Sequence, residues 1–132
     1  MTMRILIVDD DADLIEGLRW YLEAEGFQVI AASDGEAAIE TFRKERPDLV
    51  ILDIMMPKMD GYETCKRLKS DDATRGIPVI LLSAKGRNVD QKMGFEVGAD
   101  DYITKPFSPR KLVERINVIL NQQGDLPKEE AV

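Results

Sequence analysis

Residues 4–11 read Arg4-Ile5-Leu6-Ile7-Val8-Asp9-Asp10-Asp11, a short apolar run that is followed at once by three aspartates. An unbroken apolar run of this length predicts a β-strand that is buried on both faces, as in a parallel sheet. The run is too short for a membrane span or for the core of a signal peptide, so we expect neither here. The aspartates would then stand at the carboxyl end of a buried strand.

The same succession of short strand and amphipathic helix recurs along the chain. We expect further strands over residues 27–32, 48–53, 77–83 and 101–104. We expect helices over residues 12–25, 33–46, 62–70 and 88–97, and a last helix that Ser108 caps and Pro109 begins. Ser33 and Glu36 have the spacing of a capping box at the start of the second helix. The alternation predicts an α/β fold, a doubly wound parallel sheet with helices on both faces.

The composition is that of an ordinary globular domain, and it excludes several kinds of chemistry. The 132 residues are enough for one domain, which we expect to span residues 1–121 with a polar, disordered tail over 122–132. The net charge of −7 repels nucleic-acid phosphates, so we expect no direct binding of DNA or RNA. The chain has no histidine and one cysteine, Cys65, which excludes Ser-His and Cys-His catalysis, a phosphohistidine carrier and thiolate zinc sites. A single thiol fits a cytoplasmic protein, and any metal must be held mainly by oxygen atoms.

Polar residues gather at the expected carboxyl ends of the strands, where parallel α/β sheets bind their ligands. They are Asp9, Asp10 and Asp11 after the first strand, Asp53 and Ser83 at the ends of the third and fourth, and Lys105 after the fifth. Crowded carboxylates repel one another, and Mg²⁺ offsets that repulsion while it keeps coordination positions open for phosphate oxygens. A lysine and a hydroxyl nearby could bind the other phosphoryl oxygens, so the set suits phosphoryl transfer.

Each of these residues has a simpler interpretation when it is taken alone. An aspartate after a strand often caps the next helix, and one of the three at positions 9–11 could do so. Capping accounts neither for three acidic residues in a row nor for Asp53, which is followed by a loop with Pro57. Lys105 and Ser83 would by themselves be an ordinary surface residue and an ordinary turn residue. Their combination is what indicates a site.

Several segments together resemble the receiver domain of bacterial response regulators over about residues 3–121. The segments match in order and in spacing, and they are Ile5–Asp11, Leu52–Pro57 with Asp60-Gly61, Val79–Ala84 and Gly98–Phe107. The resemblance implies a flavodoxin-like fold, with five parallel strands in the order 2-1-3-4-5 flanked by five helices.

The resemblance also implies a metal site and a phosphoacceptor. Asp53 would accept the phosphoryl group. Mg²⁺, or Mn²⁺ in its place, would be held by Asp10, by Asp53 and by the main-chain carbonyl of Met55, with Asp9 acting through water. Lys105 would pair with the phosphoryl group once it is transferred.

The same resemblance implies a conformational switch. Ser83 stands where threonine is common in the family, and its hydroxyl would bind a phosphoryl oxygen. Tyr102 would rotate inward as Ser83 moves, although by itself it is a half-buried tyrosine of a strand. The peptide bond between Lys105 and Pro106 would be cis.

Two other classes of protein share parts of this pattern. A phosphatase with an aspartyl nucleophile usually places a second aspartate two residues after the first, where this chain has Met55. A flavin-binding module of the same topology needs serine, threonine and glycine in its first phosphate loop, where this chain has three aspartates. We therefore expect a phosphoacceptor of a two-component signalling system. It would not be an enzyme, because it would assist only its own phosphorylation and dephosphorylation.

The first helix offers a surface for the phosphodonor. The chain lacks histidine, so it needs a separate histidine kinase or phosphotransfer protein. Asp13, Gly17, Trp20 and Ala24 lie opposite the apolar stripe of this helix, and members of the family dock their kinase there. Trp20 is therefore a candidate anchor for the kinase, although a single exposed apolar residue is also normal on a protein surface.

A second surface, made by the expected fourth helix, the fifth strand and the last helix, would contact a downstream protein. Related regulators that dimerise through this surface carry several ion pairs across it. This chain keeps one candidate pair, Asp101 with Arg115, but has Gln91 and Asn117 in place of basic residues and Lys111 in place of an acidic one. We therefore expect a monomer or a weak dimer. Two arrangements stay open: a stand-alone regulator, or the amino-terminal receiver of a longer transcription factor or output enzyme.

Overall fold

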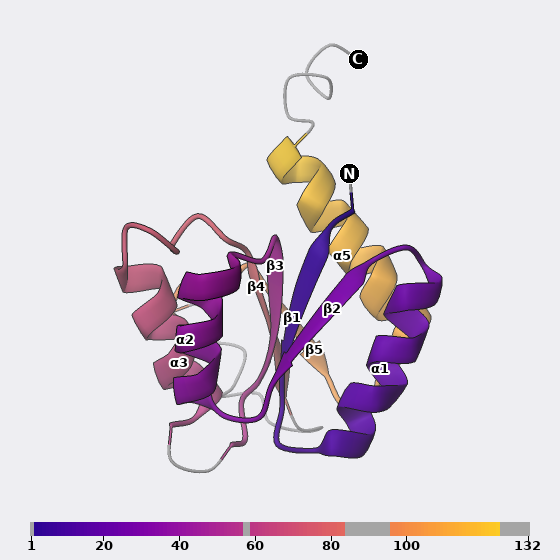
Figure 1. Ribbon diagram of the computed structural model, residues 1–132, viewed down its shortest axis with the longest axis horizontal. Coiled ribbons are helices and arrows are strands. Elements are labelled where there is room, and N and C mark those ends of the chain that lie inside the picture. Colours follow the sequence, from indigo (N-terminus) through magenta and orange to yellow (C-terminus); the bar gives the residue numbers. More distant parts are fainter. Residues whose placement is uncertain (1, 57–58, 84–95, 125–132) are drawn as a thin grey trace.

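A five-stranded parallel sheet forms the centre of the computed structural model, which describes residues 2–56, 59–83 and 96–124 (Figure 1). The order of the strands is β2-β1-β3-β4-β5. Their bounds are β1 Arg4–Val8, β2 Gln28–Ala32, β3 Leu49–Asp53, β4 Val79–Ser83 and β5 Asp101–Thr104. The predicted α/β fold and the predicted strand order are both confirmed.

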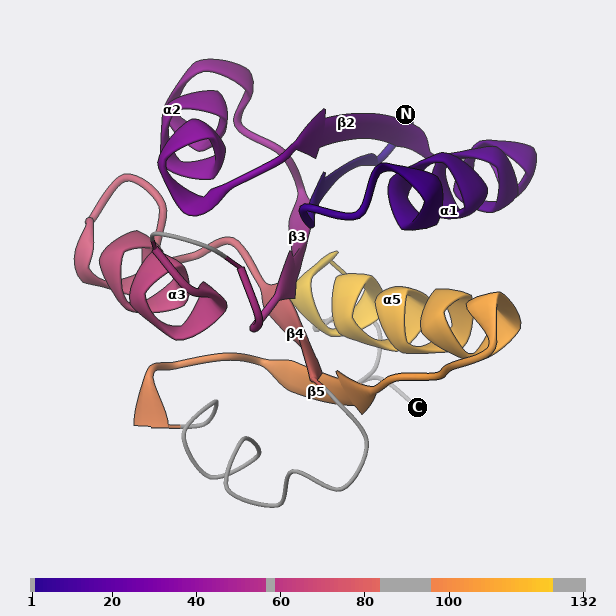
Figure 2. The same cartoon turned by 90° about the horizontal axis from the view of Figure 1, so that it is seen from below.

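Helices cover the two faces of this sheet. Their bounds are α1 Ala12–Ala24, α2 Gly35–Glu45, α3 Gly61–Ser70 and α5 Pro109–Gly124. α1 and α5 pack on one face and α2 and α3 on the other (Figure 2). Among the described residues, no helix is long and apolar enough to cross a membrane.

Two predicted boundaries fall near the limits of the described residues. The predicted helix over 88–97 lies outside them except for its last two positions. α5 continues to Gly124, so residues 122–124 belong to a helix rather than to the predicted tail. The rest of that tail, residues 125–132, lies outside the described residues.

The apolar run of β1 is buried on both faces, as predicted. Ile5 and Ile7 pack with α1 and α5, while Leu6 and Val8 pack with α2 and α3, because successive side chains of a strand point to opposite faces. All four side chains have no exposed surface. Each fully buried side chain of this size contributes about 1.5–3 kcal/mol to stability, so the central strands hold the sheet firmly.

Side chains at the helix starts explain where the helices begin. Asp11 caps α1, since its carboxylate accepts hydrogen bonds from the N–H groups of Asp13 and Leu14. Ser108 caps α5 as predicted, because its hydroxyl oxygen accepts a hydrogen bond from the N–H of Lys111 at 3.3 Å. A carboxylate or hydroxyl in this position satisfies an N–H group that has no partner inside the helix.

The predicted capping box at Ser33 and Glu36 is wrong. Asp34 caps α2 instead, since its carboxylate accepts a hydrogen bond from the N–H of Ala37 at 2.8 Å. Gly35 is then the first residue of the helix, where a Cβ atom would lie 2.3 Å from Oγ1 of Thr64 on α3. The start of α2 thus packs closely on α3, and this packing cannot be read from local sequence preferences.

Candidate functional site

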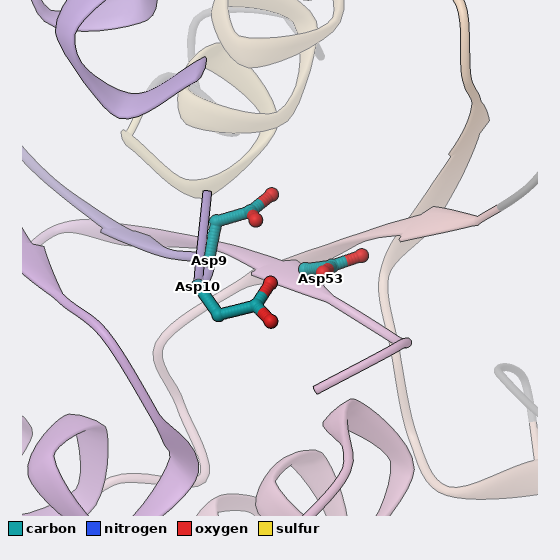
Figure 3. A group of neighbouring side chains, drawn as sticks. All are labelled: Asp9, Asp10 and Asp53. Carbon is teal, nitrogen blue, oxygen red and sulfur yellow. The ribbon is translucent and has the colours of Figure 1, made fainter. Parts of the chain in front are cut away.

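Three carboxylates meet at the carboxyl edge of the sheet. Asp9 and Asp10 follow β1 and Asp53 ends β3, and these two strands are neighbours. One carboxylate oxygen from each residue lies within 4.8 Å of the other two (Figure 3). Asp9 and Asp53 are buried and Asp10 is exposed, so the group is open to solvent on one side.

The consecutive aspartates at positions 9–11 have different structural roles. Asp11 does not join the carboxylate group, because its side chain caps α1. The N–H of Asp11 donates a hydrogen bond of 2.9 Å to Oδ1 of Asp9, which orients that buried carboxylate. The expectation that one of the three caps a helix is confirmed for Asp11, and the other two belong to the site.

Lys105 reaches the same group from the end of β5. Its Nζ atom lies 3.2 Å from Oδ2 of Asp9 and 3.3 Å from Oδ1 of Asp53. The peptide bond between Lys105 and Pro106 is cis, as the resemblance implied. The predicted convergence of β1, β3 and β5 residues on one edge is therefore observed.

The carboxylates and the lysine change one another's protonation. Burial raises the pKa of Asp53, the negative charge of Asp9 raises it further, and the ammonium of Lys105 lowers it only in part. For Lys105, burial works against the charged form, but the carboxylates of Asp53 and Asp9 outweigh it, and the pKa of the ammonium is raised. The site thus holds more negative charge than one lysine offsets, which favours a second cation.

These donors suit a hard divalent cation. Mg²⁺ prefers carboxylate and carbonyl oxygens, needs one or two carboxylates from the protein and keeps its other positions for water or phosphate. Asp9, Asp10 and Asp53 supply such oxygens. Met55 lies two residues after Asp53, and its N–H donates a hydrogen bond of 3.3 Å to Oδ1 of Asp53, so the backbone turns back over this carboxylate.

Ser83 carries a buried hydroxyl beside the site. It follows Leu82, the register partner of Asp53 on the neighbouring strand β4. Its Oγ atom is buried and has no hydrogen-bond partner among the described residues. A buried hydroxyl without a partner costs about 1–3 kcal/mol, so the Ser83 hydroxyl is suited to donate a hydrogen bond to a group that is not part of the protein chain.

Tyr102 and the surface of α1 lie away from the carboxylates. Tyr102 is half-buried on β5, opposite Leu81 of β4, as predicted for a strand tyrosine. On α1, the predicted exposed face is observed: Asp13, Gly17, Trp20 and Ala24 are all exposed. Trp20 is 75% exposed, which is far more than a large aromatic side chain usually shows.

A groove that the sequence did not reveal runs between α1 and the segment after β5. Its volume is about 600 Å³. It is lined by Asp13, Leu14, Gly17, Leu18, Lys105, Pro106, Phe107 and Pro109. The groove thus joins the exposed face of α1 to Lys105 of the site. The segment Pro106–Pro109 carried no sequence signal for this role, because only the tertiary structure places it beside α1.

Comparison with known proteins gives one consistent result. A family model described as the response regulator receiver domain matches residues 5–117. The chain is 45% identical over 122 residues to the alkaline phosphatase synthesis transcriptional regulatory protein PhoP of Bacillus subtilis, covering 92% of this chain and 50% of that protein. It is 46% identical over 129 residues to the DNA-binding response regulator MtrA of Mycobacterium tuberculosis, covering 98% of this chain and 55% of that protein. The chain thus spans about half the length of these relatives.

A solved structure agrees with these relatives. The CheY-like response regulator receiver domain protein of Methanospirillum hungatei has a TM-score of 0.88 and is 30% identical in sequence. The match covers 95% of this chain and 98% of that one. The similarity therefore extends over the whole fold and includes all the strands that carry the site.

The raised pKa of Asp53 leads to a stability prediction. The folded, metal-free domain binds a proton at Asp53 more tightly than the unfolded chain does, so its stability falls as the pH rises from 3.8, the ordinary value, through the raised pKa. Asp53→Asn removes this loss. At pH 7 without divalent metal, we therefore expect this variant to melt at a higher temperature than the wild type.

Differential scanning calorimetry in a chelating buffer and in millimolar Mg²⁺ tests this prediction. The gain should shrink when Mg²⁺ is added and also at acid pH, where the wild-type carboxyl is protonated. Asp11→Asn is the matched control, because asparagine caps a helix as well as aspartate does. A metal-free Asp53→Asn domain that melts no higher than Asp11→Asn would contradict the electrostatic account.

Proposed function

The chain belongs to the family of response regulator receiver domains, and we propose that it takes a phosphoryl group on Asp53 and signals to a partner protein by a change in conformation. The observation that carries this proposal is the convergence of Asp9, Asp10, Asp53 and Lys105 on one edge of the sheet. Since the chain has no histidine, the phosphodonor is a separate histidine kinase or phosphotransfer protein.

The transfer step follows from the chemistry of the donor and of Asp53. A carboxylate oxygen of Asp53 attacks the phosphorus atom of a phosphohistidine, the P–N bond breaks, and the imidazole leaves. The product is an acyl phosphate on Asp53. Such transfers depend mainly on positioning and on neutralising the charge of the phosphoryl oxygens. The Lys105 ammonium supplies one positive charge within 3.3 Å of the nucleophile.

The nucleophile must be ionised when it attacks. Burial and the charge of Asp9 raise the pKa of Asp53 and so favour its unreactive, protonated form. Mg²⁺ bound by Asp10, Asp53 and the carbonyl of Met55, with Asp9 acting through water, would stabilise the ionised form and neutralise the phosphoryl oxygens; Mn²⁺ could replace it. Lys105 acts in the same sense and holds one phosphoryl oxygen after the transfer.

Ser83 and Tyr102 would convert phosphorylation into a change of shape. The buried hydroxyl of Ser83, which has no partner among the described residues, would donate a hydrogen bond to a phosphoryl oxygen on Asp53. Movement of Ser83 toward the site would make room for the half-buried ring of Tyr102 on the neighbouring strand. In this account Lys105 serves the transfer, and Ser83 senses its product.

The proposal assigns the chain a signalling role in the cytoplasm, without turnover of other substrates. The only chemistry proposed is phosphorylation and dephosphorylation of its own Asp53.

The exposed face of α1, with Asp13, Gly17, Trp20 and Ala24, would receive the kinase, and the adjoining groove leads from this face to Lys105. A downstream protein would bind the surface of β5 and α5 together with the chain segment before β5. The relatives named above are about twice as long, so a receiver within a longer transcription factor or output enzyme is the second candidate.

Phosphate uptake tests the proposal directly. We expect the purified domain to gain one phosphoryl group from a small phosphodonor in millimolar Mg²⁺ or Mn²⁺, and none in a chelating buffer, because the transfer needs the second cation. Asp53→Asn should gain none, since an amide oxygen is a poor nucleophile. Intact-mass spectrometry is the measurement, and equal uptake by Asp53→Asn would refute Asp53 as the acceptor.

Ser83→Ala is the companion variant in this experiment. It should still take up phosphate, because Lys105 and the carboxylates remain, but it should lose most of the NMR shift changes around Tyr102. Full shift changes in phosphorylated Ser83→Ala would show that Ser83 does not couple the site to the tyrosine.

Transfer from the kinase tests the role of Trp20. Exposed aromatic anchors often contribute a large share of binding energy, so we expect Trp20→Ala to slow phosphotransfer from a phosphorylated histidine kinase by about tenfold or more. Uptake from a small phosphodonor should not change, because Trp20 does not line the site. Val118→Ala on α5 is the matched control, since Val118 is also an exposed apolar side chain, at 52%. Equal transfer rates in Trp20→Ala and Val118→Ala would argue against the anchor.

The oligomeric state after phosphorylation is a further part of the proposal. Nε and Nη2 of Arg115 donate hydrogen bonds of 2.6 and 2.7 Å to the carboxylate of Asp101 in the same chain, so the one ion pair kept for a dimer is already satisfied within the monomer. We expect the Mg²⁺–beryllofluoride form to sediment as a monomer or a weak dimer at micromolar concentration. A tight symmetric dimer in analytical ultracentrifugation would overturn this expectation.

A further inference from the structure

Gly61 lies against the backbone of the residue that the proposal phosphorylates. It is the first residue of α3, and a Cβ atom placed on it would lie 2.4 Å from the carbonyl oxygen of Asp53. The same atom would lie 2.8 Å from Cα of Ile54. Both neighbours are main-chain atoms, so no rotation of a side chain could relieve the overlap. Only glycine fits at position 61 while β3 and α3 stay where they are.

The backbone angles do not explain this glycine. Positive φ values among the described glycines occur at Gly26 and Gly98, not at Gly61. Helix propensity does not explain it either, because glycine is a poorer helix former than alanine. The close approach of α3 to the end of β3 is therefore the reason for Gly61.

Ile54, which Gly61 touches, is held by hydrogen bonds from two sides. On one side, the N–H of Ile54 donates a hydrogen bond of 3.0 Å to the carbonyl of Leu82 on β4. On the other side, the carbonyl of Ile54 accepts hydrogen bonds from the N–H groups of Gly61 at 3.0 Å and Met56 at 3.2 Å. The contact between Ile54 and Gly61 closes the loop that carries Met55. The end of β3 and this loop are thus fixed by the first turn of α3.

We propose that Gly61 is a positioning residue for the metal and phosphoryl site. By letting α3 meet the Asp53–Ile54 peptide directly, it sets where the Asp53 carboxylate and the Met55 carbonyl lie relative to Asp9 and Asp10. This inference rests on the proposed function, since it concerns the cation that the site would hold. It gives a role to the Asp60-Gly61 pair, which none of the steps described above requires.

A side chain at position 61 would disturb the site because the surrounding structure cannot yield. α3 is fixed by its buried residues Thr64, Cys65 and Leu68, and Thr64 is in turn packed closely against Gly35 of α2. β3 is paired with both β1 and β4 as far as Leu52, whereas Asp53 at its end is paired with β4 alone. The displacement would therefore fall on the end of β3 and on the loop after it. A shift of about 1 Å in a reacting group can cost about a hundredfold in rate.

Magnesium binding by Gly61→Ala tests the inference. We expect the variant to fold and to bind Mg²⁺ at least about tenfold more weakly than the wild type, because two of the proposed oxygen donors move. The measurement is isothermal titration calorimetry with MgCl₂ alone, and near-ultraviolet circular dichroism verifies the fold.

Two glycine variants separate a local effect from general loss of stability. Gly26→Ala strains the backbone at a φ of +98° between α1 and β2, so it should lower the melting temperature without meeting any atom within 4 Å. Gly76→Ala adds a methyl group where no atom lies within 4 Å. Both should bind Mg²⁺ within about twofold of the wild type, as expected of sites that share no partner with the metal ligands.

A pair of helix-cap variants tests the same idea without a steric clash. Asp60 caps α3 and Asp34 caps α2, each through a carboxylate that accepts a hydrogen bond from the N–H three residues later. Replacement of either aspartate by alanine should lower the melting temperature to a similar extent, because each replacement removes one helix cap. Asp60→Ala loosens the turn that holds the Asp53–Ile54 peptide, so it should weaken Mg²⁺ binding by about threefold, whereas Asp34→Ala should leave it unchanged.

The outcomes distinguish this inference from the proposed function. A folded Gly61→Ala domain with wild-type affinity for Mg²⁺ would overturn the positioning role and leave the phosphoacceptor proposal intact. If Gly61→Ala does not fold, equal Mg²⁺ affinities of Asp60→Ala and Asp34→Ala would overturn it. A wild-type domain that binds no Mg²⁺ and takes up no phosphate would overturn both.

Discussion

Repulsion among three carboxylates is the constraint on which the rest of the site depends. Asp9, Asp10 and Asp53 hold oxygen atoms within 4.8 Å of one another, and two of these side chains are buried. Burial raises the pKa of Asp53, and the negative charge of Asp9, which water screens poorly there, raises it further. Lys105 offsets part of this charge. The remaining excess accounts for the affinity for a divalent cation that the proposal requires.

The sheet provides the rigidity that keeps these charges together. β1 and β3 are central strands with fully buried apolar side chains on both faces, so the ends that carry the aspartates cannot move apart without exposing the core. α3 adds a second support, since its first residue touches the main chain of Asp53. The energy of hydrophobic burial thereby holds an electrostatically unfavourable arrangement in place, as is common at functional sites.

Lys105 depends on an edge strand that is held from both faces of the sheet. Asp100 and Asp101 lie at the start of β5, and each forms an ion pair with a basic side chain from a helix on a different face of the sheet. Nζ of Lys69 on α3 lies 2.9 Å from Asp100, and Nε of Arg115 on α5 lies 2.6 Å from Asp101. The Asp101 side chain is almost buried, so its hydrogen-bonded pair with Arg115 counts for more than an exposed ion pair would. These contacts fix where β5 lies along β4, and with it the point from which Lys105 reaches the carboxylates.

The amino-acid sequence by itself determined the strands, their parallel arrangement and which polar residues gather at the carboxyl edge of the sheet. Apolar runs such as Ile5–Val8 and Leu49–Leu52 indicate strands covered on both faces, because the runs are short and charged residues bound them at both ends. The aspartates, Ser83 and Lys105 could be placed at one edge because all parallel strands end on the same side of a sheet. Their order in the sheet came from the resemblance to a known family.

Only the tertiary structure decided which residues the close contacts require. Local preferences favour Ser33 as a cap as much as Asp34, and only the structure shows that Asp34 caps α2. Three consecutive aspartates look equivalent in the sequence, yet one caps a helix and two form the site. The roles of Gly61 and of the Pro106–Pro109 segment depend on contacts between elements far apart in the chain. Sequence patterns report the environment of each residue along its own element, whereas such contacts arise only when elements pack together.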